Sequence, residues 1–242
     1  MLRASFIAFV LLAVAATGAA ADTSGSKNFI ARPKIGAARP ALPAQVTWQA
    51  NSATDGEHLV TMTLVVDASS VLRNVKALTA AALNKSKPCG DTLRVHDASA
   101  KLMSPTTLAY NLSFHYSKKI CAPNNMSLEL PAEVSCKSLI VLSGRGTQIT
   151  VDIRGATREP CAIDGSTAGI AQFASKKVFK KHILDLTDQL PPEFSGVAIN
   201  LKSIKFETGT PRLRVTGEST MTDQQFQAFV ARLNSIRHAS SR

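Results

Sequence analysis

The sequence has few acidic residues, few aromatic residues and few cysteines. Its 242 residues include 17 Asp and Glu against 28 Lys and Arg, 5% aromatic residues and four cysteines. Four cysteines are too few for a small scaffold built from disulfides, and the composition also excludes collagen-like and coiled-coil proteins. Hydrophobic residues still make up 45% of the chain, which is too many for a chain that is disordered throughout. The length indicates one domain of moderate size or two small ones.

Catalytic signatures are missing as well. The sequence contains no G-x-S-x-G motif, and none of its five histidines belongs to an H-E-x-x-H motif. His96-Asp97 and His115 come within reach of each other across a predicted hairpin, where a solvent-facing pair on a sheet is favoured over a catalytic dyad. The sequence therefore predicts a protein that is not an enzyme, with no catalytic residues, no cofactor and no metal ligands.

Residues 1–21 have the pattern of a secretory signal peptide. Arg3 supplies a positive charge, residues 6–16 form an apolar run, and Ala19 to Ala21 are the small residues that a signal peptidase requires. The run is shorter than the ~20 residues of a membrane span, so a cleaved signal is favoured over an N-terminal membrane anchor. We expect cleavage after Ala21 and a periplasmic or secreted protein without a transmembrane segment. Arg3 is the one charged residue in this segment, so the formal charge of +11 becomes +10 after cleavage.

All four cysteines follow the predicted cleavage site, and an even number in an exported chain indicates disulfides, with three possible connectivities. Residues 92–102 and 106–118 have the pattern of a hairpin, in which facing residues have numbers that sum to about 209. Cys89 and Cys121 fit this sum. We therefore expect them to lie opposite each other and to form one disulfide.

The remaining two cysteines, Cys136 and Cys161, flank a second predicted hairpin that turns at residues 143–146. Their numbers fit its register less well, so a bulge or a loop has to absorb the difference. The pair Cys136–Cys161 is nevertheless favoured. A reactive thiol pair is the alternative, but neither pair has the close spacing of an exchange motif.

Hydrophobic periodicity predicts a regular order of strands and helices. Strands are expected at 46–50, 59–66, 92–102, 106–118, 139–142, 149–153, 197–206 and 211–220. Helices are expected from Ser69 or Ser70 onward, around 175–190, and from Thr222, where Thr222 and Gln225 form a capping box. This order predicts an α+β fold of antiparallel bent sheets packed on amphipathic helices, with an internal duplication ββαββ-ββαββ-α.

A shared irregularity supports the duplication. In the first unit Leu93 and Val95 face the core, and then the phase slips so that Ala98 does. In the second unit Leu201 and Ile204 show the same slip, 106 residues later. Each slip predicts a β-bulge, which bends a strand.

The predicted domain organisation follows from this repeat. Residues 22–44 are rich in Pro, Ala and basic residues and are expected to be a basic linker. A single α+β domain is expected over 45–237, with similar halves at 45–122 and 134–221 and a C-terminal helix at 222–237.

Two sets of residues are candidates for binding. A possible lining for an apolar ligand, with a packed core as the alternative, comprises Leu112, Phe114, Tyr116, Val178, Phe179 and Ile183. A possible anion-binding patch, with a solvated helix face as the alternative, comprises Lys176, Lys177, Lys180 and Lys181. Nucleic acid is not expected as a partner, because the basic residues are not interleaved with stacking aromatics.

The stretch Cys89-Gly-Asp-Thr-Leu-Arg-Val-His-Asp-Ala-Ser99, together with Tyr116-Ser-Lys-Lys-Ile-Cys121, resembles uncharacterised exported proteobacterial proteins. This resemblance covers mainly residues 89–121 and implies no activity. The predicted architecture is similar to that of tubular lipid-binding (BPI-like) proteins, which implies an enclosed apolar ligand. The leading hypothesis is an exported, non-enzymatic protein that binds lipid or another apolar ligand. The alternative is a cell-envelope interaction module that uses its basic surfaces on an anionic partner.

Overall fold

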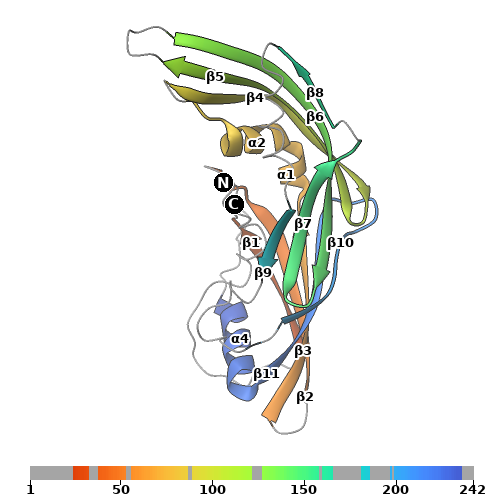
Figure 1. Ribbon diagram of the computed structural model, residues 1–242. Coiled ribbons are helices and arrows are strands. Elements are labelled where there is room, and N and C mark those ends of the chain that lie inside the picture. The colour runs from red at the N-terminus through yellow and green to blue at the C-terminus, as the bar shows by residue number, and fades with distance from the viewer. Residues whose placement is uncertain are drawn as a thin grey trace.

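The computed structural model describes residues 24–32, 38–52, 56–86, 89–121, 127–157, 160–165, 181–185, 197 and 199–235. The predicted signal peptide, residues 1–21, lies outside these ranges. The described chain forms an elongated molecule of two antiparallel sheets, with helices against the inner side of each (Figure 1). Within this part of the chain, no helix combines the length and apolarity needed to cross a bilayer.

The first sheet contains five strands in the order β1-β2-β3-β11-β10. They are β1 (Ser24–Ala31), β2 (Leu42–Ser52), β3 (Glu57–Asp67), β11 (Arg212–Thr222) and β10 (Ile199–Phe206). β1 falls inside the segment 22–44 that the sequence predicts as a linker. It forms an edge strand because Phe29 and Ala31 alternate onto the buried face and its backbone pairs with β2.

The second sheet contains six strands, five of them in the order β4-β5-β6-β7-β9. They are β4 (Gly90–Ser104), β5 (Thr107–Cys121), β6 (Ser127–Arg145), β7 (Gln148–Gly155) and β9 (Lys181–Asp185), while β8 (Cys161–Asp164) pairs with β6. The sheet curves around two short helices, α1 (Ser69–Arg73) and α2 (Val75–Leu83) (Figure 1). We call the face toward these helices the inner face and the opposite one the outer face.

The predicted α+β fold with a repeated ββαββ order is wrong. Strands account for 70% and helices for 16% of the described chain. Within the predicted helix at 175–190, residues 181–185 form strand β9, because the open edge of β7 offers backbone partners that outweigh a helical hydrophobic period. Moreover, β10 and β11 join β3 in the first sheet, so the strands do not assemble as two equivalent units.

The two sheets meet where β10 passes β6 and the turn between β4 and β5. The backbone N–H of Leu201 donates to the carbonyl of Gly146 at 2.7 Å, and that of Phe206 donates to Pro105 at 2.5 Å. Gly144 permits this close approach, since a Cβ there would lie 3.3 Å from a methyl of Leu201. The chain then turns at Gly146, whose φ of +57° favours glycine.

Both predicted β-bulges are present. The register of β4 against β5 shifts between Val95 and Asp97, and that of β10 against β11 shifts between Leu201 and Ser203. The phase of the hydrophobic pattern therefore located the bulges correctly, although the duplication inferred from them is wrong.

Three apolar clusters form the core along the length of the molecule. One lies between the first sheet and α4 (Asp223–Ser235), where the predicted stripe of Phe226, Phe229, Val230 and Leu233 is buried. A second fills the junction of the two sheets. The third lies between α2 and the inner face of the second sheet.

Both predicted disulfides, Cys89–Cys121 and Cys136–Cys161, are present, and they account for all four cysteines. Cys136 and Cys161 are direct partners between β6 and β8. The difference in register is absorbed after Gly155, where β7 ends before β8 begins. Of the two predicted ways to bring Cys136 and Cys161 together, a bulge or a loop, the structure uses the connection between β7 and β8.

The helix ends follow the sequence in part. At α4 the predicted capping box is formed, since the Thr222 N–H donates to Gln225 Oε1 at 3.0 Å and the Gln225 N–H donates to Thr222 Oγ1 at 3.3 Å. α1 begins at Ser69, one of the two expected starts, but neither Ser69 nor Ser70 caps it through its side chain. The Asp67 carboxylate instead accepts from the Ser69 N–H at 2.8 Å. Hydrogen bonds from the Ser69 hydroxyl and backbone, aided by nearby Arg212, lower the pKa of Asp67.

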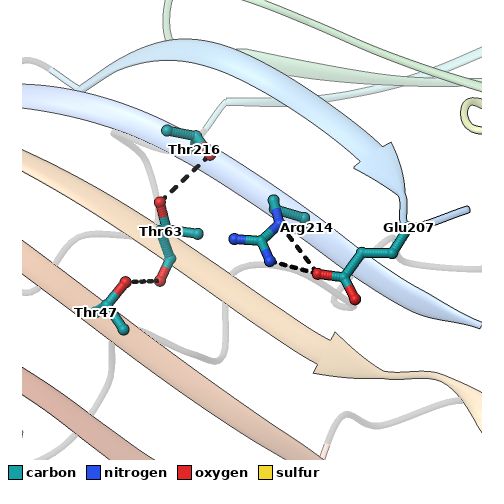
Figure 2. A network of polar contacts seen from close by, with 5 residues as sticks. All are labelled: Thr47, Thr63, Glu207, Arg214 and Thr216. Atoms are coloured by element: carbon teal, nitrogen blue, oxygen red, sulfur yellow. Dashed lines mark hydrogen bonds and ion pairs between the residues drawn. The ribbon is translucent and has the colours of Figure 1, made fainter. Parts of the chain in front are cut away.

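The side of the first sheet that faces away from α4 is polar. Thr47, Thr63 and Thr216 lie in one row across three strands, with 3.4 Å between the hydroxyls of Thr63 and Thr216 (Figure 2). Beside them the Arg214 guanidinium makes two contacts with the Glu207 carboxylate (Figure 2). This alternation of polar outer and apolar inner positions leaves one side of the sheet for packing.

Candidate functional site

Three of the predicted lining residues lie together under α2. Leu112, Phe114 and Tyr116 alternate onto the inner face of β5 and are 2%, 1% and 6% exposed. They belong to the cluster that includes Val75 of α2 and Val134 of β6. In this part of the molecule they form a packed core between helix and sheet, which was the alternative interpretation.

The other predicted lining residues do not join them. Val178 and Phe179 lie outside the described residues. Ile183 lies on β9, at the opposite edge of the sheet from β4, and is 56% exposed. The structure therefore does not bring Ile183 together with Leu112, Phe114 and Tyr116, because residue 183 belongs to a strand paired with β7.

The predicted anion-binding lysines can be placed only at one position. Lys176, Lys177 and Lys180 lie outside the described residues. Lys181 is exposed at the start of β9, directly opposite Asp152 of β7. A carboxylate on the neighbouring strand weakens the positive field at this position.

The apolar row of the inner face continues beyond the packed core. Ile120 of β5 and Leu128 of β6 are direct cross-strand partners, and they are 48% and 57% exposed. Leu130, two residues further along β6, is half-buried. We call Ile120, Leu128 and Leu130 the apolar tip; it lies at the end of the β5–β6 pair, at the upper left of Figure 1.

Sequence reasoning missed this tip, although a signal was present. The alternation that begins at Leu108 and runs through Phe114 reaches Ile120 without interruption, so Ile120 was assignable to the inner face. What the sequence did not show is where α2 ends relative to β5. The point along β5 at which α2 stops covering the sheet decides which residues of this row stay exposed.

Polar groups mark the boundary between core and tip. The Tyr116 hydroxyl donates to the Asp91 carboxylate at 2.9 Å, and Lys85 Nζ lies 4.0 Å from the same carboxylate. Burial of the phenol, together with the neighbouring Asp91, raises the pKa of Tyr116 to about 12. Lys118 is exposed on the inner face between Tyr116 and Ile120 and is the direct partner of Leu130. A cation therefore stands beside the exposed apolar side chains.

The disulfide Cys89–Cys121 secures the end of β5 next to this tip. It joins the residue before β4 to the last residue of β5, one position after Ile120. A crosslink here restricts fraying of the strand that carries Ile120.

The outer face of the same strands carries a polar cluster. His115 Nδ1 lies 2.7 Å from Glu133 Oε1, and His96 Nε2 lies 3.5 Å from Glu133 Oε2. The imidazole rings of His96 and His115 are 6.3 Å apart at an interplanar angle of 76°. The hairpin therefore does bring the two histidines together. The sequence did not indicate Glu133, which comes from a third strand.

An open depression of about 330 Å³ lies elsewhere, over the first sheet, with Phe29, Pro43, Asp67 and Arg212 among its lining residues. It involves none of the predicted binding residues. Its walls mix apolar and charged groups.

The comparisons with known proteins add little to this geometry. No protein-family model matches the sequence, and no curated protein matches it. A crystal structure of a lipopolysaccharide binding protein is similar at a TM-score of 0.32 and 11% identity. The match covers 68% of this chain and 33% of that chain, so this chain spans about a third of the other protein's length. The similarity to BPI-like proteins that the sequence suggested is therefore loose.

Proposed function

We propose that this chain is an exported, non-enzymatic protein that binds an anionic lipid molecule at the apolar tip. The observation that carries the proposal is the exposed cross-strand pair Ile120 and Leu128, which stands beside Lys118 on the inner face. An acyl chain would lie on the apolar pair, and the acidic head group would face the lysine.

The apolar tip leaves aliphatic surface exposed to water. Ile120 and Leu128 lie side by side and each exposes about half of its side chain to water, whereas Phe114 of the same row is fully buried. Burying the exposed apolar surface of the pair would be favourable. A lipid chain supplies that burial without rearranging the sheet. In the described part of the chain Lys118 forms no ion pair. Its direct partner on β4 is Asp91, whose carboxylate accepts from the Tyr116 hydroxyl and lies 4.0 Å from Lys85 Nζ. A phosphate or carboxylate head group would compete with Asp91 for the charge of Lys118.

Export is part of the proposal. The N-terminal segment has the pattern of a cleaved signal, and two disulfides are compatible with an oxidising compartment such as the periplasm or the exterior. An exported protein would meet the lipids of the cell envelope.

The non-enzymatic assignment also belongs to the proposal. The inner face near the tip offers aliphatic side chains, Lys118, and a phenol hydrogen-bonded to the Asp91 carboxylate, with Lys85 close to the same carboxylate. These groups suit binding and positioning. The alternative of an anionic envelope partner at the predicted lysine patch has less support, because Lys181 is the one member of the patch among the described residues.

The test is a titration with short-chain phosphatidylglycerol held below its critical micelle concentration, followed by native mass spectrometry of the complex. The wild type is expected to form a 1:1 complex. The double variant I120S/L128S is expected to bind about 30-fold more weakly, because each side chain contributes about 1 kcal/mol through the half of its surface that is still exposed. Phosphatidylcholine of the same chain length reports the part of the affinity that does not depend on charge.

Matched control variants are available on the same hairpin. Met103 is 62% exposed at the opposite end of β4, so M103S removes an apolar side chain of similar exposure away from the tip. K118A is expected to weaken binding of phosphatidylglycerol a few-fold, while K119A, on the outer face, leaves it unchanged. Equal affinities for wild type, I120S/L128S and M103S would contradict the proposal.

A further inference from the structure

The outer face of the second sheet carries a second candidate site, unrelated to the apolar tip. Side chains of β4, β5 and β6 meet there, namely His96, His115 and Glu133. One ligand atom from each lies within 4.8 Å of the others. We propose that these three side chains bind a divalent transition-metal ion of the zinc and copper type.

The fold explains why these residues meet. His115 and Glu133 are direct cross-strand partners, so their side chains project from the same face. The bulge between Val95 and Asp97 leaves His96 as the extra residue of β4, and both His96 and Asp97 are exposed while Val95 is buried. A bulge re-aims side chains in this way and is a common device beside functional sites.

The spacing suits a small ion. Zinc binds imidazole nitrogen and carboxylate oxygen at about 2.0–2.2 Å, so neighbouring ligand atoms in a tetrahedral set stand about 3.3 Å apart. His115 Nδ1 lies 2.7 Å from Oε1 of Glu133, and His96 Nε2 lies 3.5 Å from the other carboxylate oxygen, Oε2. Small side-chain rotations would therefore bring both imidazoles and one carboxylate oxygen onto the same ion, with water completing the shell.

The ligand types select the metal class. Two imidazoles and one carboxylate suit zinc, copper and nickel, whereas calcium and magnesium prefer oxygen ligands alone. All four cysteines are in disulfides, so no thiolate competes for the ion. The three side chains are partly exposed, with exposed fractions of 48% for His96, 31% for His115 and 59% for Glu133, which leaves the ion an entry path.

The surrounding charges also favour a cation. Asp164 of β8 lies directly opposite Glu133, and Asp97 follows His96 on the same face. Arg94 of β4 is the direct partner of His115 and supplies one opposing charge. In a chain with a formal charge of +11, this gathering of three carboxylates on one face stands out as a local acidic area.

The test is an isothermal titration of untagged protein, with its disulfides intact, by Zn²⁺ and by Cu²⁺. We expect one saturable site per chain, with tighter binding of Cu²⁺ than of Zn²⁺. H96A, H115A and E133Q are each expected to weaken Zn²⁺ binding at least about tenfold, since even the loss of an outer-shell partner costs 10- to 100-fold. H182A, which removes a histidine of β9, serves as the control and should bind as the wild type does.

A second readout separates coordination from general electrostatic attraction. Co²⁺ bound to nitrogen and oxygen ligands shows visible ligand-field bands, and these should be present in the wild type and H182A and absent in H96A and H115A. E133Q preserves size and shape, so its folding is expected to match the wild type by circular dichroism. Absence of a saturable Zn²⁺ site, or equal affinities in wild type, H96A, H115A and E133Q, would overturn the proposal. Because the apolar tip lies on the opposite face, neither result affects the lipid proposal.

Discussion

The Tyr116 hydroxyl donates a hydrogen bond of 2.9 Å to the Asp91 carboxylate. This contact lies on the inner face of the second sheet, between buried Phe114 and exposed Ile120 of the same strand. It therefore separates the packed core under α2 from the apolar tip. The burial of Tyr116 and its hydrogen bond to Asp91 also raise the pH at which the phenol ionises.

Ionisation of Tyr116 is expected to have a midpoint near pH 12. Burial of the phenol is the main cause of the raised pKa, and the hydrogen bond to the negative Asp91 adds to it. An unfolded tyrosine ionises near pH 10. The protonated phenol therefore stabilises the fold fully below about pH 10, and this contribution is lost as the pH rises through about 12.

The measurement is a phenolate absorbance titration in Y110F, because the chain contains two tyrosines and this variant leaves Tyr116 as the reporter. Substitution of Asp91 by Asn in the same background should lower the midpoint. A midpoint near 10 in Y110F would show that the phenol is neither buried nor bonded as described.

A methyl group at Gly25 is expected to disrupt the edge of the first sheet. Gly25 and Trp48 are direct partners between β1 and β2, and a Cβ at Gly25 would lie 2.1 Å from the indole ring. G25A should destabilise the protein by about 1–3 kcal/mol, the usual cost of overpacking. Trp48 is the single tryptophan and is 5% exposed, so its emission should shift to longer wavelength. S24A on the same strand is the control, and an unchanged spectrum in G25A would refute the close packing.

Removal of the Cys89–Cys121 disulfide is expected to lower stability by about 4 kcal/mol. The crosslink closes a loop with a sequence separation of 32 residues, and its loss increases the entropy of the unfolded chain. C89S/C121S should show a lower urea midpoint. The double variant should also bind lipid more weakly, because the end of β5 frays. An unchanged midpoint would mean that the disulfide contributes no net stability.

The capping box of α4 is expected to contribute about 1 kcal/mol. Thr222 and Gln225 satisfy each other's backbone N–H groups, which would otherwise be unpaired at the helix start. T222A and Q225A should each lower the free energy of unfolding. The loss in the double variant should be smaller than the sum of the two single losses, since both remove the same reciprocal contact. Additive losses would argue against a shared cap.

Local patterns predicted much of the fold correctly. The hairpin of β4 and β5, both β-bulges, both disulfides and the capping box at the start of α4 all follow from alternation, turns and capping within short stretches of the chain. The approach of His96 and His115 also followed, because a hairpin has its register set locally.

The sequence by itself thus determined which residues alternate, where the strands bend and how the cysteines pair. The tertiary structure alone decided that residues 181–185 extend β7, that β10 and β11 complete the first sheet, and that Glu133 reaches both histidines. It also decided that the inner row is buried at Phe114 and exposed at Ile120. The physical reason is that backbone pairing at a free strand edge and the reach of α2 depend on partners distant in the chain, which no local pattern specifies.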